Sequence, residues 1–311
     1  MANVLLWEIN VFRAVAEARS FVAAAKKMGC SPSAVTRAIQ SLEAILNIEL
    51  FRRNRKVVSL TSAGEIYYRY AVLMTSAQEE AIEELGSRGG ALQGWMRFSA
   101  PETMGLTLLP YVLNRISARF PKLKFEVRFT DEMLDPVEEG LDFAIRGGFP
   151  QSSELIGYSL IDYSRSLFAS PEYVRSAGAP VSPEDVQHHS VILHTGPRIL
   201  KDWYFSNETE RIRVHVEPRF RFSSGSAVYM GVRNGLGVAR LASWLVEEDV
   251  QKGRLMPVCS DYSVTAATGQ HPQLHAVYAR ATASKRVRGF LEVLQGEVRA
   301  AFEHHKWGLE K

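Results

Sequence analysis

The chain has 311 residues, of which 46% are hydrophobic and 23% are charged, and its formal net charge is +3 at pH 7. This length exceeds the size at which one hydrophobic core usually keeps growing, so we expect two or more domains. No stretch reaches the roughly 18 consecutive apolar residues of a membrane span, and no basic segment precedes the apolar N-terminal residues, which argues against a secretory signal and for the cytoplasm.

The charge is divided unevenly along the chain. Residues 1–64 hold nine basic residues against four acidic ones, a net charge of +5, which leaves −2 for the remainder. A basic end on a slightly acidic body indicates that the first segment meets a polyanion. Nucleic acid is the partner that this division favours, although composition alone does not establish it.

Two helices are expected before residue 30. Apolar residues recur at helical spacing over residues 5–18, and Ser20 can cap a shorter helix over residues 21–28. Gly29 tolerates the left-handed backbone that ends such a helix. The chain is therefore predicted to turn at this glycine.

A third helix is predicted immediately after the turn, with Ser31 as its cap and Pro32 in the first helical position. Its buried stripe is predicted to consist of Ala34, Val35, Ile39 and Leu42. Small polar and basic side chains, which are able to read base edges or hold phosphate, are predicted on the other side. Two short helices with this arrangement are typical of a DNA-reading helix-turn-helix, although an ordinary helical hairpin has the same pattern.

The following segment, LFRRNRKVVSLTSAG from Leu50, predicts a short β-hairpin with a basic tip. A charge run is usually only a solvated face, but a basic hairpin directly after a recognition helix is typical of a wing that reaches phosphates or the minor groove. The predicted DNA contacts are Ser31, Pro32, Ser33, Thr36, Arg37, Gln40, Arg52, Arg53, Arg55 and Lys56.

The segment FRAVAEARSFVAAAKKMGCSPSAVTRAIQSLEAILNIELFRRNRKVVSLTSAGE resembles the N-terminal signature of the LysR-type transcriptional regulators, nearly without gaps. Thr36 stands where the family usually has serine and keeps the hydroxyl, while Met28 and Asn47 replace the commoner leucine and glycine. The resemblance implies a DNA-binding regulator with a winged helix-turn-helix and a C-terminal domain that senses a small molecule.

A capping-box pattern of Ser62 and Glu65 opens a run over residues 65–85 without glycine or proline, which predicts one long helix. Its narrow apolar seam suits pairing with the same helix of a second subunit and consists of Ile66, Tyr70, Leu73, Ala77, Ala81 and Leu85. The alternative is that the seam packs on the chain's own effector domain. The resemblance implies a homodimer or homotetramer, and a two-fold protein can read both halves of a palindromic promoter site in double-stranded DNA. The glycines that follow, from Gly86 to Gly94, mark a flexible connection.

The rest of the chain alternates strands and helices, which predicts an α/β fold with a parallel sheet covered by helices. From Met96 we expect the strands MRFSA, LKFEVRF and DFAIRGG, a helix around residues 106–120 and a short helix near Val137. A second α/β unit follows, and LHAVYA with a final helix from Lys285 returns to the first. This order resembles the two-lobed, periplasmic-binding-protein-like effector domain of the family. The predicted limits are 1–61 for the winged helix-turn-helix, 62–90 for the linker helix and hinge, and 91–311 for the effector domain, whose lobe I is 91–162 with 268–311 and whose lobe II is 163–267.

Ligands of open α/β sheets bind beyond the carboxyl ends of the strands. Hydroxyls at a helix start together with an arginine suit an organic anion or another small polar metabolite, although plain helix capping by Ser99 and Thr103 is equally open. In the family fold the cleft between the lobes holds the effector, and its closure is the signal. The predicted effector contacts are Ser99, Pro101, Thr103, Arg146, His194 and Ser224.

The sequence holds no nucleophile elbow, phosphate loop or cofactor fingerprint, so neither an enzyme nor a bound cofactor is expected. The histidines and the two cysteines, Cys30 and Cys259, lack the spacing of a metal site or a disulfide framework. An enzyme or solute-binding module is the rival class that a two-lobed body suggests. A solute receptor normally needs an export signal, however, and the N-terminus offers none.

Overall fold

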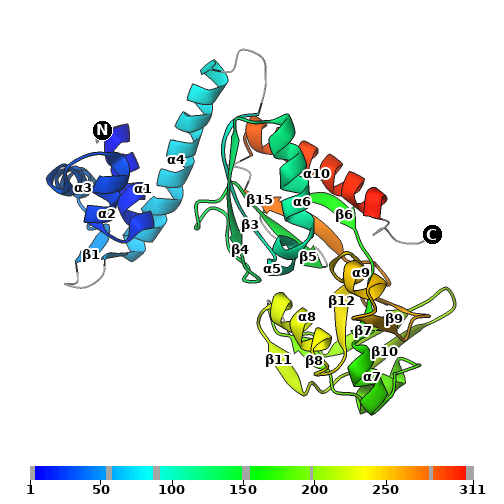
Figure 1. The fold of residues 1–311 in the computed structure, drawn as a ribbon. Helices are drawn as coiled ribbons and strands as arrows, with labels where there is room; N and C mark the ends of the chain where they lie inside the picture. The colour runs from blue at the N-terminus through cyan, green and yellow to red at the C-terminus, as the bar shows by residue number, and fades with distance from the viewer. Residues whose placement is uncertain are drawn as a thin grey trace.

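The computed structural model describes residues 4–53, 58–86, 92–148, 155–196, 199–279 and 283–305. Figure 1 shows a small helical unit at the N-terminus, a long helix that leads away from it, and a two-lobed α/β body. Within these residues, no helix combines the length and the apolar character that crossing a membrane would require.

The N-terminal unit packs three helices against a two-stranded hairpin. Phe12 lies at its centre, with its ring centroid 5.2 Å from those of both Phe51 and Tyr67. The caps follow the sequence prediction, because the Ser20 side chain accepts the Ala23 N–H and Gly29 has a φ of +66°. The elements are α1 Leu6–Ala18, α2 Phe21–Met28, α3 Pro32–Leu46, β1 Phe51–Arg53 and β2 Val58–Leu60.

The long helix α4 spans Ser62–Gly86, and its cap lies one residue earlier in the chain than predicted. Its cap is Thr61 and not Ser62, because the Gly64 N–H donates to the Thr61 hydroxyl at 3.0 Å. That hydroxyl also donates to the carbonyl of Glu49, which fixes Thr61 outside the helix. A Cβ on Gly64 would lie 2.1 Å from the Leu50 carbonyl oxygen, so the helix start and the hairpin approach each other too closely for any side chain.

Lobe I is built on a five-stranded sheet in the order β4-β3-β5-β15-β6. The expected parallel arrangement holds for β4, β3 and β5, whereas β15 runs antiparallel to both of its neighbours. β15 carries the chain back from lobe II and lies between β5 and β6 in the sheet. Because it runs in the opposite direction, the sheet is mixed. The strands are β3 Gly94–Ala100, β4 Leu123–Phe129, β5 Phe143–Gly148, β6 Ile156–Asp162 and β15 Gln273–Tyr278.

The helix predicted around residues 106–120 is α6 Leu108–Arg119, and a short helix that was not predicted, α5 Glu102–Leu106, precedes it and meets it at Thr107. The break places Pro110 in the first turn of α6, where a proline needs no hydrogen-bond acceptor; in a continuous helix its ring would clash with the carbonyl of Leu106.

The prediction of a short helix near Val137 was wrong, because residues 136–140 form only turns. The Asp135 carboxylate accepts the N–H groups of Val137 and Glu138, and Gly140 has a φ of +65°. A capped turn that reaches a left-handed residue so soon does not extend into a helix.

Lobe II carries three small sheets, in the orders β12-β7-β13, β11-β8 and β10-β9-β14. The largest core of the chain runs from lobe I through Tyr163 and Trp244 into lobe II, and α5 contacts both α8 and α9. The lobes therefore share apolar packing. The elements are β7 Arg165–Ala169, α7 Pro171–Ala177, the 3-10 helix Glu184–His188, β8 Ile192–His194, β9 Asp202–Ser206, β10 Arg211–His215, β11 Phe220–Phe222, α8 Gly225–Arg233, β12 Ala239–Ala242, α9 Ser243–Gln251, β13 Met256–Val258 and β14 Ser263–Thr265.

Replacing Phe290 by alanine should destabilise lobe I. Phe290 lies on α10, Lys285–His305, is fully buried, and packs with Phe98, Phe125 and Phe143. We expect a loss of about 3–5 kcal/mol in the free energy of unfolding, measured by urea titration with circular dichroism. The control is Phe129→Ala, which removes a side chain that is 43% exposed. Equal losses for both variants would contradict this account of the core.

Candidate nucleic-acid interface and the junction between the lobes

The third helix buries one side and leaves the other open to solvent. Val35, Ile39 and Leu42 are fully buried, as predicted, whereas Ala34 is only half-buried and Ala38 completes the stripe. Of the predicted DNA contacts on this helix, Thr36 is half-buried, and the exposed ones are Ser31, Pro32, Ser33, Arg37 and Gln40. The face that a DNA groove would meet is therefore accessible.

Several of these side chains are held by the helix itself. The Ser31 hydroxyl accepts the Ala34 N–H at 3.2 Å, and the Thr36 hydroxyl donates to the carbonyl of Pro32 at 2.9 Å. Arg37 donates from Nε to the carbonyl of Ser33 at 3.3 Å. This bond uses Nε alone and does not engage the two terminal nitrogens, which are the atoms that a guanidinium offers to a base or phosphate.

The carboxylate of Glu43 ties the end of α3 to the hairpin. Its Oε1 accepts the N–H groups of Leu50 at 2.8 Å and Phe51 at 3.2 Å, and both side chains are buried. Arg52 is exposed on β1 and pairs with Ser59 of β2. The side chain of Arg53, and the whole of Arg55 and Lys56, lie outside the described residues. The helix face and the described base of the hairpin thus form one rigid unit.

The predicted seam of α4 is open to solvent in the single chain. Ile66 is 51% and Tyr70 is 60% exposed, Ala77 and Ala81 are exposed, and Leu73 is half-buried. The side chain of Leu85 lies outside the described residues. The opposite side of the helix packs on α1, where buried Arg13 donates to the Thr75 hydroxyl at 2.7 Å. The alternative, in which the seam packs on the chain's own effector domain, does not describe these exposed residues.

Two carboxylates of lobe I reach donors of lobe II. Asp131, just after β4, accepts the N–H of Gly225 at 2.6 Å and that of Glu102 at 3.3 Å, which are the first residues of α8 and α5. The Glu102 carboxylate accepts the hydroxyl of Ser224. One carboxylate therefore joins the starts of two helices, one from each lobe, where the partial positive charge of a helix favours an anion.

His194 completes this contact. Its Nε2 lies 3.1 Å from the carbonyl oxygen of Ser223 and 3.3 Å from Oδ2 of Asp131. Because a carbonyl oxygen only accepts, this geometry assigns the proton to Nε2. Burial by itself would raise the pKa of Asp131, but the hydrogen bonds from His194 and from the Gly225 and Glu102 amides outweigh it and hold the pKa below its usual value. A depressed carboxyl pKa stabilises the folded chain above the ordinary aspartate pKa, and this stabilisation is lost as the pH falls through the depressed value.

The six predicted effector residues divide into two groups. Thr103, His194 and Ser224 lie at the junction of the lobes, with Pro101 directly before α5; a Cβ on Gly225 would lie 3.1 Å from Cγ2 of Thr103. Ser99 is buried in β3, and Arg146 donates to the carbonyl of Leu134, within lobe I. The start of α5, where we expected room for an anion, holds the carboxylate of Asp131.

Neither Asp131 nor Glu102 is among the predicted effector contacts. Asp131 follows the strand LKFEVRF, so the rule that drew attention to the end of the first strand would also have indicated this aspartate. Its partner Gly225 is 94 residues away, and no local pattern connects the two.

Comparison with known proteins supports both parts of the chain. Residues 6–65 match the family described as bacterial regulatory helix-turn-helix protein, lysR family, and residues 89–299 match the LysR substrate binding domain. The transcriptional regulator PtxR of Pseudomonas aeruginosa is 31% identical over 290 residues, which cover 92% of this chain and 91% of PtxR.

Solved structures agree with this assignment. CrgA, a LysR-type transcriptional regulator from Neisseria meningitidis, is 28% identical with a TM-score of 0.57, over 94% of this chain and 98% of CrgA. The full-length Vibrio cholerae virulence activator AphB is 27% identical with a TM-score of 0.57, over 94% of this chain and 99% of AphB.

Replacing Asp131 by alanine should loosen the junction between the lobes. The substitution leaves the N–H groups of Gly225 and Glu102 without their charged acceptor, for which we expect a loss of about 1–3 kcal/mol in the free energy of unfolding. Small-angle scattering should also report a larger radius of gyration. The control is Glu132→Ala, the exposed neighbour. If both variants kept the wild-type dimensions and stability, Asp131 would not hold the lobes together.

Proposed function

The chain belongs to the LysR-type transcriptional regulators, and we propose that it binds a palindromic promoter site as an oligomer, under the control of a small molecule bound between its lobes. The observation that carries the proposal is the open polar face of α3, which Glu43 fixes to a basic hairpin. In this proposal the chain is divided at the limits predicted from the sequence: 1–61, 62–90 and 91–311.

We assign the two parts of the DNA interface different tasks. Arg37 and Gln40 on the outward face of α3 are of the kinds that form paired hydrogen bonds with guanine and adenine in the major groove. Arg52 and the basic residues of the hairpin tip suit phosphates, which position the protein without reading sequence. Specificity then resides in the helix, and much of the salt-dependent affinity resides in the hairpin.

We assign the α4 seam to the contact between two subunits. Ile66 and Tyr70 form an exposed apolar line on a helix that is otherwise anchored to α1. Pairing of two such helices would bury this line and set two copies of α3 on one DNA duplex. The added binding energy of two half-sites explains why an oligomer is the form we propose.

The site of action that we propose is the cytoplasm, where the bacterial chromosome lies. We propose no enzymatic reaction, since the relatives named above are transcriptional regulators. In a two-lobed sensor, a ligand acts through its different affinity for two arrangements of the lobes.

Selection of bound DNA from a random pool tests the proposal directly and should return one enriched palindrome. Arg37→Ala should change which bases are preferred, by about 1–3 kcal/mol at one position of each half-site. Arg52→Ala should weaken binding about equally for all sequences and reduce the slope of log K against log salt by about 1. Arg221→Ala, a distant exposed arginine, is the control. A pool without any enriched site would contradict the proposed function.

The oligomer can be tested separately through the seam of α4. Tyr70→Glu places a charge in the apolar line and should weaken self-association at least tenfold, or about 1.4 kcal/mol, in analytical ultracentrifugation. Because Tyr70 is 60% exposed in the single chain, the unfolding of the monomer should change little. Glu65→Gln on the same helix is the control. Unchanged association of the Tyr70 variant would place the subunit contact elsewhere.

A further inference from the structure

Two arginines of lobe II, Arg165 and Arg240, lie beside each other on neighbouring strands. The register of β7 and β12 pairs Arg165 with Ala242 and Leu167 with Arg240, so both arginines project from the same face of the sheet. In the part of the chain that the structure describes, neither guanidinium forms an ion pair with a carboxylate. Among the described residues, these two neighbouring cations thus have no carboxylate that neutralises them.

Each guanidinium is held in place by an aromatic ring. Cζ of Arg165 lies 5.6 Å from the ring centroid of Tyr163, and its terminal nitrogen donates to the Tyr163 hydroxyl at 2.7 Å. Cζ of Arg240 lies 4.7 Å from the ring centroid of Trp203. The rings are almost wholly buried, and both arginines are half-buried. Stacking uses the flat face of a guanidinium and leaves its N–H edge for hydrogen bonds.

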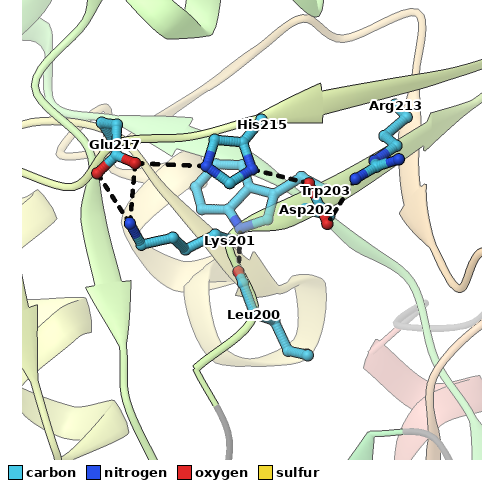
Figure 2. A network of polar contacts seen from close by, with 7 residues as sticks. All are labelled: Leu200, Lys201, Asp202, Trp203, Arg213, His215 and Glu217. Carbon is cyan, nitrogen blue, oxygen red and sulfur yellow. Dashed lines mark hydrogen bonds and ion pairs between the residues drawn. The ribbon is translucent and has the colours of Figure 1, made fainter.

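The ring beneath Arg240 is itself fixed. The Trp203 indole N–H donates to the carbonyl of Leu200 at 3.0 Å, as Figure 2 shows. Figure 2 also shows the cations on and beside β9 and β10, the strand pair that carries Trp203. Each of these cations has a carboxylate within 3.3 Å. Those pairs join Lys201 to Glu217, Arg213 to Asp202, and His215 to both acids. Arg165 and Arg240 differ from these three cations, because no described carboxylate pairs with either guanidinium.

This arrangement is unfavourable for the free protein. Burial, followed by repulsion from Arg165, lowers the pKa of Arg240 to about 9, so the side chain still carries its charge at neutral pH. Partly desolvated charges are retained at a cost to stability unless an opposite charge compensates them. Titratable groups whose pKa is strongly shifted, and which have no oppositely charged partner in the protein, are characteristic of binding sites.

The pair lies where the chain crosses between the lobes. Tyr163 lies between β6 of lobe I and β7 of lobe II, and a Cβ on Gly147, near the end of β5, would lie 3.4 Å from the Tyr163 hydroxyl. The other donors suited to an anion, at the starts of α5 and α8, are already bonded to Asp131. Arg165 and Arg240 are therefore half-buried positive charges at this connection that no described carboxylate compensates.

We propose that Arg165 and Arg240 bind the carboxylate of an organic-acid effector, which lies across the connection between the lobes. The Tyr163 hydroxyl accepts a hydrogen bond from Arg165, so its own proton is free to be donated to the same carboxylate. This inference rests on the proposed function, because it names the ligand class of the sensing domain. It also moves the main anion contact away from Arg146, which is bonded within lobe I.

The test measures the thermal unfolding midpoint of the full chain in millimolar acetate, benzoate, succinate and citrate. Sodium chloride at equal ionic strength is the reference, and acetamide, benzamide and succinamide are the neutral analogues. We expect at least one carboxylate to raise the midpoint by about 2 °C or more. The amides should not do so. Arg165→Gln and Arg240→Gln should abolish the shift, and Arg175→Gln, an exposed arginine of α7 in the same lobe, should keep it.

A further variant separates binding from a structural role. Arg240→Met keeps an apolar stem over Trp203 but removes the charge, so its midpoint without carboxylate should equal or exceed that of the wild type. A lower midpoint would make Arg240 a structural residue and overturn the proposal. A carboxylate shift that is equal in all variants, or absent from all, would overturn it as well.

The same preparations distinguish this inference from the proposed function. Wild type and Arg175→Gln are also tested for binding to the selected DNA site without added carboxylate. Failure of both to bind DNA would contradict the proposed function and leave the carboxylate result standing. DNA binding without any carboxylate shift would contradict only the arginine site.

Discussion

The hydrogen bonds from the backbone of Leu50 and Phe51 to the carboxylate of Glu43 hold together the part of the molecule on which its function depends. A recognition helix is useful only if its outward face has a fixed orientation relative to the neighbouring phosphate contacts. Glu43 supplies that orientation because it satisfies two backbone donors at the start of the hairpin with one charged acceptor. The missing side chain of Gly64 allows α4 to start directly against the same residues. The recognition helix α3, the hairpin and α4 are consequently one rigid unit.

In the effector domain, the positions of the carboxylates determine which donors between the lobes are already bonded. Asp131 and Glu102 of lobe I occupy the donors that lobe II presents at α8 and Ser224. In the described part of the chain, the arginines at the connection of the lobes pair with no such acid. A two-lobed sensor of this kind has one charged contact that is satisfied within the chain and one that requires a ligand, and their balance can bias the arrangement of the lobes.

Prediction from the sequence succeeded where a local interaction decides the structure. Ser20, Gly29 and Ser31 cap or end helices through atoms a few residues away, and the structure has these caps. It failed where a contact from a distant part of the chain decides the structure. Thr61 replaced Ser62 as a cap because a distant carbonyl fixes it. The expected parallel sheet became mixed because β15 arrives from the other lobe.

The sequence by itself therefore determined the recognition helix, the basic hairpin, the open seam of α4 and the α/β class of the body, since helical spacing, caps and charge runs act over short distances. Only the tertiary structure decided which charges meet. Asp131 and Gly225 are 94 residues apart, and Arg165 and Arg240 are brought together by the pairing of β7 with β12. Electrostatic energy depends on distance and burial in space, and neither quantity is written in the order of residues along a chain.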